Sequence, residues 1–258
     1  MTNRLMFAIQ KGGVGKSTST VAVAEILAAT GYRVLVVDLD PQGNATKMLT
    51  GNSIYQYSGR TIMEAIQEGN AEPYIVNAKD CLDVIPAEDR LATFSQYIYT
   101  SKVNNPHAVL KRLLESVEGR YDFVFVDVGP NLGDAVVNAI VYVNHIIVPV
   151  DLGDLSMDAM VRFIEFVEEI KAEGRTVAEI TGLLLTMRDN RSRYEREVSE
   201  GIRAAYEDLV FQTEIRRKVK IKEMSANGVD IVSEAMEDYM ALTEEILSRV
   251  KGKENHHE

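Results

Sequence analysis

The stretch Gln10-Lys11-Gly12-Gly13-Val14-Gly15-Lys16-Ser17-Thr18 decides the fold of this chain. It begins at the end of the predicted strand Leu5–Gln10 and opens a helical pattern, which is the setting of a phosphate-binding loop. Glycines let backbone N–H groups approach phosphate oxygens, and the start of the helix adds partial positive charge. The loop therefore predicts ATP bound by residues 12–18, with Lys16 on the β- and γ-phosphates and the Ser17 hydroxyl on Mg²⁺.

One departure from the usual loop pattern is informative. The pattern G-x-x-x-x-G-K-[ST] requires glycine where this chain has Gln10, and an additional lysine, Lys11, follows it. A glycine-rich turn with chance lysines is the alternative, but a position between a strand and a helix favours a phosphate site.

Three aspartates follow apolar strands. Asp38 and Asp40 close the run that begins at Val34, and Asp127 closes the run Phe123–Val126. Residues two apart on a strand share one face, so Asp38 and Asp40 should point the same way. Ligands bind at the carboxyl ends of strands in an open α/β sheet, so these aspartates are candidates to hold Mg²⁺ and aim a water. Each could instead cap a helix or form a turn.

Short apolar runs alternate with helical patterns along the chain. This alternation predicts one doubly wound α/β domain of the P-loop type, with a mostly parallel sheet and helices on both faces. We expect the domain over residues 1–250 and a frayed, charged tail over residues 251–258. The predicted strands are Leu5–Gln10, Arg33–Asp40, Leu82–Pro86, Asp122–Asp127, His145–Val150, Ile180–Met187 and Leu209–Ile215. The predicted helices are Lys16–Thr30, Pro106–Glu118, Leu155–Ala172, Tyr194–Tyr206 and Ser233–Val250, and Leu49–Gly59 should be a loop.

Composition narrows the class of protein. Of 258 residues, 46% are apolar and 26% are charged, as in a globular domain. The single cysteine, Cys81, excludes an internal disulfide and a two-cysteine metal or cluster site within one chain. The chain has neither a signal-peptide pattern nor an apolar run of about 18 residues, so we expect a cytoplasmic protein that does not span a membrane. The net charge of −11, taken alone, argues against a nucleic-acid binder.

Three segments together resemble the ParA/Soj partition ATPases, which belong to the wider deviant Walker A, or ParA/MinD, group. They are the loop from Lys11 to Ser17, the segment Asp38-Leu-Asp-Pro-Gln-Gly-Asn-Ala-Thr46 and the strand from Tyr121 to Asp127. Further matching segments extend the resemblance over nearly the whole chain and favour the partition branch: Leu82–Ala87, Asn138-Ala139, Leu183–Met187 and Val210–Thr213.

The resemblance implies a role for each matching residue. Lys11 would reach the γ-phosphate in a second subunit, so that two chains enclose two ATP molecules. Lys16 and Ser17 would act within their own subunit. Asp38 and Asp127 would hold Mg²⁺, and Asp40 would orient or activate the attacking water. The chain around Met187 would lie near the adenine.

Two positions depart from the family pattern. Gly129-Pro130 stands where the family usually has two prolines, and glycine should loosen this segment. Ile215-Arg216-Arg217 stands where the family tends to have Ile-Pro-Arg, which leaves the local backbone shape open.

A basic patch lies within this acidic chain. Residues 188–222 contain ten Arg or Lys and seven Asp or Glu, whereas the rest of the chain has 18 and 32. If folding joins Arg188, Arg191 and Arg193 to the basic run Arg216–Lys222, they form a surface for phosphate backbones. No recognition-helix motif suggests sequence-specific contacts. The resemblance implies DNA contacts from Arg191 and Lys220, with Arg217, Lys218 and Lys222 able to assist. A solvated charged surface is the alternative.

The resemblance implies an ATPase whose ATP-bound homodimer binds DNA non-specifically and is reset by hydrolysis, as in plasmid or chromosome segregation. A ParB-like centromere-binding protein would stimulate hydrolysis, and the protein would associate with the nucleoid. Because the loop begins near the start of the chain, we expect no operator-binding domain. Two alternatives stay open: a MinD-like ATPase that positions a membrane-bound or protein cargo, and an ATP-driven switch with negligible turnover. The acidic helix Ser233–Val250 argues against membrane binding.

Overall fold

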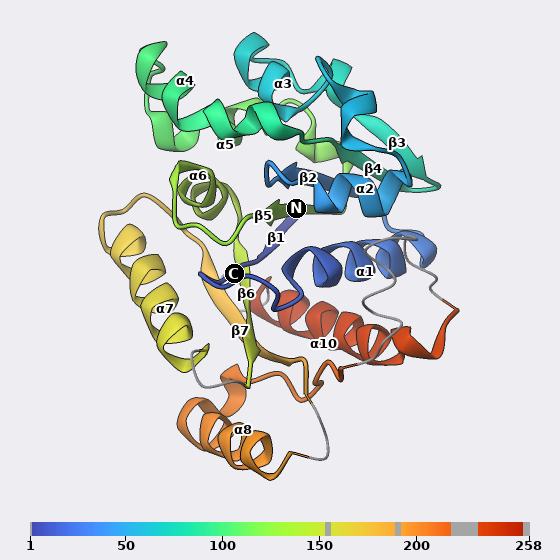
Figure 1. Ribbon diagram of the computed structural model, residues 1–258, viewed down its shortest axis with the longest axis vertical. Coiled ribbons are helices and arrows are strands. Elements are labelled where there is room, and N and C mark those ends of the chain that lie inside the picture. Colours follow the sequence, from blue (N-terminus) through green and yellow to red (C-terminus); the bar gives the residue numbers. More distant parts are fainter. Residues whose placement is uncertain (1, 153–155, 189–191, 218–231, 255–258) are drawn as a thin grey trace.

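The computed structural model describes residues 2–152, 156–188, 192–217 and 232–254. Its sheet has seven strands in the order β3-β4-β2-β5-β1-β6-β7 (Figure 1). Neighbouring strands are parallel except for β3 and β4 at one edge. The doubly wound, mostly parallel sheet predicted from the sequence is therefore confirmed. The strands are β1 (Asn3–Phe7), β2 (Val34–Leu39), β3 (Val76–Lys79), β4 (Leu82–Ile85), β5 (Phe123–Val128), β6 (His145–Asp151) and β7 (Glu179–Thr186).

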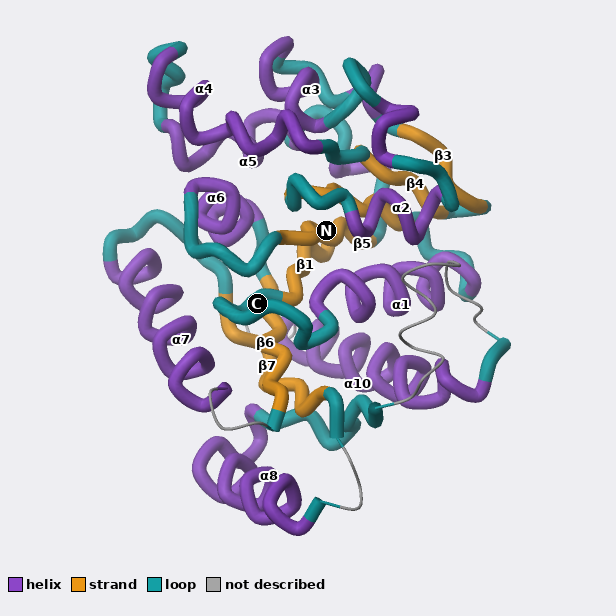
Figure 2. Tube along the Cα trace, in the orientation of Figure 1, coloured by secondary structure: helices purple, strands orange, loops and turns teal. Residues whose placement is uncertain are grey.

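Helices cover both faces of the sheet. On one face, α1 (Lys16–Ala29) and α10 (Glu237–Glu254) pack against each other, and α2 (Asn44–Thr50) lies beside α1 (Figure 1). Helix α8 (Arg193–Tyr206) lies beyond β7 (Figure 2). The opposite face carries α3 (Ile62–Glu68), α4 (Phe94–Thr100), α5 (Val109–Leu114), α6 (Asp134–Tyr142) and α7 (Ser156–Ala172).

Successive strand residues enter two different cores. In β1, Leu5 and Phe7 pack with the α1 and α10 side, whereas Met6 packs with the α3 to α7 side. Both faces of the central strands are buried, which explains why their sequences are almost wholly apolar. Within the described ranges, no helix combines the length and the apolar character needed to cross a membrane.

The predicted strand Leu209–Ile215 is wrong. This segment starts at the last residue of the 3₁₀ helix Glu207–Leu209, and among the described residues it makes a single isolated bridge, from Val210 to Leu183 of β7. The Glu245 carboxylate on α10 accepts the N–H groups of Gln212 at 2.9 Å and Thr213 at 3.0 Å. Because a side chain takes these N–H groups, the segment cannot form a continuous ladder with β7.

Several short elements differ from the sequence patterns. The patterns do not predict α2, α3, α4, α6 or β3, each of which has nine residues or fewer. The predicted loop Leu49–Gly59 contains the end of α2 and the 3₁₀ helix Ile54–Tyr57. The predicted helix Pro106–Glu118 is divided into the 3₁₀ helix Pro106–Ala108, then α5, then the 3₁₀ helix Glu118–Arg120. Helix α10, preceded by the 3₁₀ helix Glu234–Met236, continues past Val250 to Glu254.

Candidate active site

The glycine-rich loop connects β1 to α1 at the carboxyl end of the sheet. Gly13 (φ 75°) and Gly15 (φ 87°) adopt left-handed conformations that other residues rarely adopt. Gly15 is the N-cap of α1, where no described side chain caps the helix and the first turn contains no acid. The first N–H groups of this helix are therefore left to bind an anion.

The Lys16 side chain lies inside the site. Only 7% of Lys16 is exposed, and its Nζ donates a hydrogen bond to the carbonyl oxygen of Lys11 at 2.8 Å. Burial lowers the pKa of Lys16, while the charges of Asp127 and Asp40 act in the opposite direction. The structure thus brings the loop lysine and two of the three predicted aspartates into one electrostatic cluster.

Asp38 and Asp127 are direct neighbours across strands β2 and β5, and both are fully buried. Asp38 Oδ2 accepts the N–H of Thr46 at 2.8 Å and its hydroxyl at 2.7 Å, and Asp38 Oδ1 accepts the N–H of Asp40 at 3.1 Å. Burial raises the pKa of Asp38 to about 6, although these hydrogen bonds favour its charged form.

Asp127 has no such support. Neither of its carboxylate oxygens accepts a hydrogen bond of good geometry from a described residue, although the Ser17 hydroxyl lies close enough to favour the charged form. Burial and the charge of Asp38 raise the pKa of Asp127 well above its usual value, although Ser17 and Lys16 oppose this shift. A buried, unpaired carboxylate is costly, and a bound cation would satisfy it.

The donor set at these strand ends fits Mg²⁺ shared with a phosphate. Within the described residues, no group of three or more His, Cys, Asp or Glu side chains could hold a metal ion by itself. Mg²⁺ binds one or two carboxylates and takes its other ligands from phosphates and water. The carboxylates of Asp38 and Asp127, with the Ser17 hydroxyl nearby, match that requirement.

Asp40 lies just beyond the end of β2 and is 7% exposed. Its Oδ1 accepts the N–H of Gln42 at 3.0 Å. A Cβ added at Gly129 would stand 3.4 Å from the Asp40 carboxylate, so the backbone after β5 packs against Asp40. Gly129, which stands where the family usually has a proline, therefore contacts Asp40, the candidate water-orienting residue.

Met187 follows β7 and has a left-handed backbone (φ 60°), which is unusual for a residue other than glycine. A Cβ added at Gly15 would stand 3.5 Å from its Cε, so Met187 lies beside the glycine-rich loop. Met187 thus lies near the phosphate-binding loop, and its contact with adenine stays a prediction.

Comparisons with known proteins agree with this geometry. The family described as AAA domain matches residues 2–180. Over 245 residues the chain is 33% identical to the sporulation initiation inhibitor protein Soj of Bacillus subtilis, an alignment that covers 92% of this chain and 95% of Soj. Over 260 residues it is 30% identical to the chromosome partitioning protein ParA of Caulobacter vibrioides, with 97% and 96% covered.

The chain belongs to the ParA/Soj family of AAA-domain ATPases. It is thus an ATPase of the segregation and positioning type. Among solved structures, it is similar to cobyrinic acid a,c-diamide synthase from Mycobacterium smegmatis with bound ADP and magnesium. The TM-score is 0.84 at 26% identity, and the match covers 97% of this chain and 96% of the other.

The basic patch of this ParA/Soj-family chain is only partly described. Arg191, Lys218, Lys220 and Lys222 lie outside the described residues. Arg217 is exposed and has no ion pair within the described ranges, and its N–H donates to the Arg188 carbonyl at 3.0 Å. It remains a candidate DNA contact.

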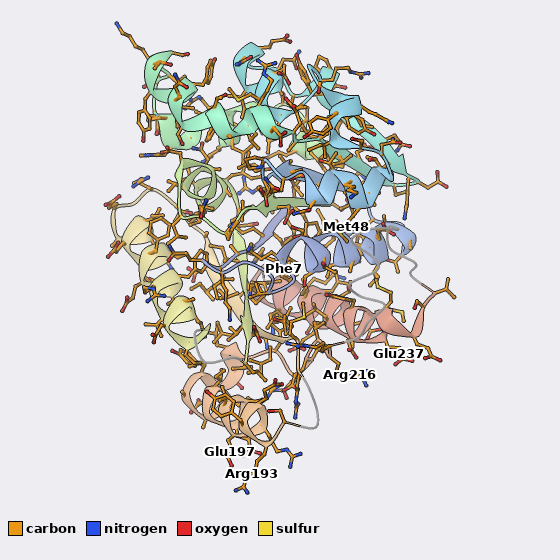
Figure 3. The ribbon with its side chains drawn as sticks, in the orientation of Figure 1. Phe7, Met48, Arg193, Glu197, Arg216 and Glu237 are labelled. Carbon is orange, nitrogen blue, oxygen red and sulfur yellow. The ribbon has the colours of Figure 1, made fainter. Side chains whose placement is uncertain are left out.

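Acidic side chains neutralise several other arginines of the patch. Arg216 binds the Asp238 carboxylate and lies 3.9 Å from Glu237 at the start of α10 (Figure 3). Arg188 pairs with Glu214, and Arg193 pairs with Glu197 along α8. The described part of the patch is therefore less positive than its sequence suggests.

The sequence patterns do not predict two residues of the ParA/Soj site, Thr46 and Asp151. The Thr46 hydroxyl donates to Asp38 and accepts the N–H of Ala87 at 3.0 Å, so it joins α2 to the end of β2 and to the segment that follows β4. Asp151 ends β6 and forms an ion pair with Lys11. A signal for Asp151 is present, because an acid follows the apolar run His145–Val150 just as Asp127 follows its own run.

Proposed function

We propose that this protein is a ParA/Soj-type partition ATPase that binds ATP with Mg²⁺, dimerises in the ATP state and then binds DNA non-specifically. The observation that carries the proposal is the meeting of a two-lysine phosphate loop with three buried aspartates at neighbouring strand ends. Family membership and the ADP and magnesium bound by the Mycobacterium smegmatis protein support the choice of nucleotide and ion.

The roles proposed for the residues follow from their positions. The N-terminus of α1 and the Lys16 ammonium bind the phosphates. Asp38, Asp127 and the Ser17 hydroxyl hold Mg²⁺, which neutralises the charge that develops on the phosphate oxygens. Asp40 orients the attacking water from its position beside Gly129.

Lys11 takes a second role in the proposed homodimer. Lys16 already lies within its own site, whereas the Lys11 side chain is directed to Asp151 and is 26% exposed. A second chain that docks on this face can therefore meet the Lys11 ammonium. Lys11 then completes the partner's ATP site, and each dimer contains two shared sites.

DNA binding is proposed to follow dimerisation. The dimer would contain two copies of the basic patch, with Arg217 and with Arg191, Lys218, Lys220 and Lys222 from outside the described residues. Two weak contacts in one particle add through avidity. The Caulobacter vibrioides relative is named a chromosome partitioning protein, which supports association with the nucleoid and a ParB-like centromere-binding partner that stimulates hydrolysis.

ATP hydrolysis and DNA retention, measured together, test this function. We expect wild-type protein with ATP to retain non-specific DNA at low salt and to release it steeply as salt rises. Asp40→Ala should dimerise and bind DNA without hydrolysis, whereas Lys11→Ala should bind nucleotide but neither dimerise nor turn over. Arg217→Ala should weaken DNA retention, and Arg193→Ala, an exposed arginine paired with Glu197, is its matched control.

Two outcomes would contradict the proposed function. If ATP-loaded protein ignores DNA at low salt and binds anionic liposomes instead, the MinD-like alternative replaces DNA partition. If ATP drives dimerisation and single-turnover hydrolysis stays negligible with DNA and partner present, the protein is a switch.

A further inference from the structure

Within one chain, an ion pair holds the side chain of Lys11. Its Nζ lies 3.2 Å from Oδ2 of Asp151, and each side chain is 26% exposed. The Lys11 N–H donates to the Ile9 carbonyl at 2.9 Å, and the Lys11 carbonyl accepts Lys16 Nζ at 2.8 Å. The Lys11 backbone is therefore fixed within the loop, and the ion pair with Asp151 directs its side chain.

The sheet makes this contact possible. β6 is the parallel neighbour of β1, so their carboxyl ends lie side by side. Asp151 is the last residue of β6 and is paired in register with Thr186 of β7. The carboxylate thus stands on a rigid strand end, and the more flexible partner in the pair is the lysine side chain.

One ammonium cannot serve two anions at a distance from each other. If Lys11 reaches a phosphate in a second subunit, it must leave Asp151. We propose that Asp151 is a positioning residue, which holds Lys11 in its own chain and is replaced by nucleotide phosphate when two chains meet. This inference rests on the proposed two-subunit site, and it adds a cost to dimerisation that the phosphate contact must overcome.

The size of that cost follows from exposure. Ion pairs that are partly open to water stabilise weakly, and the typical range corresponds to a change of up to about fivefold in an equilibrium constant. Asp151 should therefore tune the nucleotide concentration at which chains pair, rather than prevent pairing.

The test compares wild type with Asp151→Asn, which keeps the side-chain size and removes the charge. Sedimentation against ATP concentration gives the midpoint of dimerisation, and we expect the variant to pair at about two- to fivefold less ATP. In nucleotide-free protein, an amine-reactive reagent followed by peptide mass spectrometry reports the reactivity of Lys11. Asp151→Asn should raise this reactivity, because the Lys11 side chain is then no longer held against the Asp151 carboxylate.

Lys79 gives a matched control, since its Nζ pairs with Glu25 at 2.7 Å elsewhere in the chain. Asp151→Asn should leave the reactivity of Lys79 unchanged, and Glu25→Gln should raise that of Lys79 but not that of Lys11.

The two measurements separate the possible failures. If wild-type protein does not dimerise with ATP, the proposed function fails, and with it the exchange onto phosphate. If wild type dimerises while Asp151→Asn changes neither the midpoint nor Lys11 reactivity, the positioning role is overturned alone. A variant that needs more ATP to pair would also overturn it, because Asp151 would then support the dimer.

Discussion

Asp38 and Asp127 occupy the same register on neighbouring strands, with both carboxylates fully buried. Asp38 is held by Thr46 and by the N–H of Asp40, whereas Asp127 has no hydrogen-bond partner of good geometry within the described ranges. Two adjacent buried carboxylates are unfavourable without a cation, and bound Mg²⁺ would compensate for their charge.

Asp127→Asn should therefore stabilise the protein without ligands and abolish its response to Mg²⁺ and ATP. Removing one of two adjacent buried charges should raise the free energy of unfolding at pH 7 by about 1–2 kcal/mol. Urea unfolding with and without Mg²⁺ and ATP measures both effects. Asp122→Asn is the control, because Asp122 pairs with exposed Arg33 just before β5 and its loss should leave the ligand response intact. An Asp127→Asn protein that is still stabilised by Mg²⁺ and ATP would contradict this site.

The same carboxylates predict a pH dependence. Burial raises the native pKa of Asp38 to about 6 and that of Asp127 well above its usual value, whereas unfolded aspartates titrate near about 4. Between about pH 4 and pH 6 the native state thus binds more protons than the unfolded state, so the contribution of these groups to stability falls as pH rises. Without ligands, wild type should lose stability relative to Asp127→Asn across this window. A difference that stays constant with pH would be evidence against the coupled pair.

Thr46→Val should weaken Mg²⁺ binding, because it removes the hydroxyl that donates to Asp38 and leaves the N–H of Ala87 without its acceptor. A buried polar group left unpaired costs about 1–3 kcal/mol. Thr46→Ser keeps the hydroxyl and should retain most of the wild-type affinity in a titration of Mg²⁺ with a fluorescent ATP analogue. Thr20→Val makes the same chemical change at a buried hydroxyl with no partner in the described residues, so it should leave the titration unchanged. Equal effects at Thr46 and Thr20 would remove the special role of Thr46.

Gly43→Ala should strongly disturb the loop after β2. Gly43 has φ 59°, and an added Cβ would lie 2.4 Å from Ile54 Cγ2 and 3.0 Å from the Ala87 carbonyl oxygen. Gly51 has φ 68° but open space around its Cβ, so Gly51→Ala measures the backbone strain alone. We expect Gly43→Ala to cost about 1–3 kcal/mol more than Gly51→Ala in urea unfolding, owing to overpacking. Similar losses at the two glycines would show that Ile54 moves aside easily.

The sequence predicts the central features well because they depend on local patterns. A glycine-rich loop between a buried strand and a helix has few alternatives, and acids after apolar runs must lie at the carboxyl edge of a parallel sheet. The parts that failed depend on side chains distant in sequence. Glu245 on α10 captures the N–H groups of Gln212 and Thr213, and no local pattern reveals this.

The composition of a segment also does not reveal which of its charged residues form ion pairs. The basic residues between Arg188 and Lys222 suggest a positive surface, yet Glu214, Asp238 and Glu197 neutralise described members of the set. Thr46 and Asp151 were accessible in principle, since one closes the quoted segment from Asp38 and the other ends an apolar run. Their partners become visible only when the loop and strand ends meet in space.

Mixing two inactive variants tests the two-subunit site most directly. Lys11→Ala keeps Asp40, and Asp40→Ala keeps Lys11, so a mixed dimer contains one complete site if Lys11 acts across the interface. Because Lys11→Ala should not pair with itself, it enters dimers only with Asp40→Ala, and each mixed dimer has one working site of two. We therefore expect recovery of at most about half of wild-type ATP hydrolysis. If the mixture hydrolyses no more ATP than the separate variants, although sedimentation shows that mixed dimers form, Lys11 does not complete a partner's site and the central claim is contradicted.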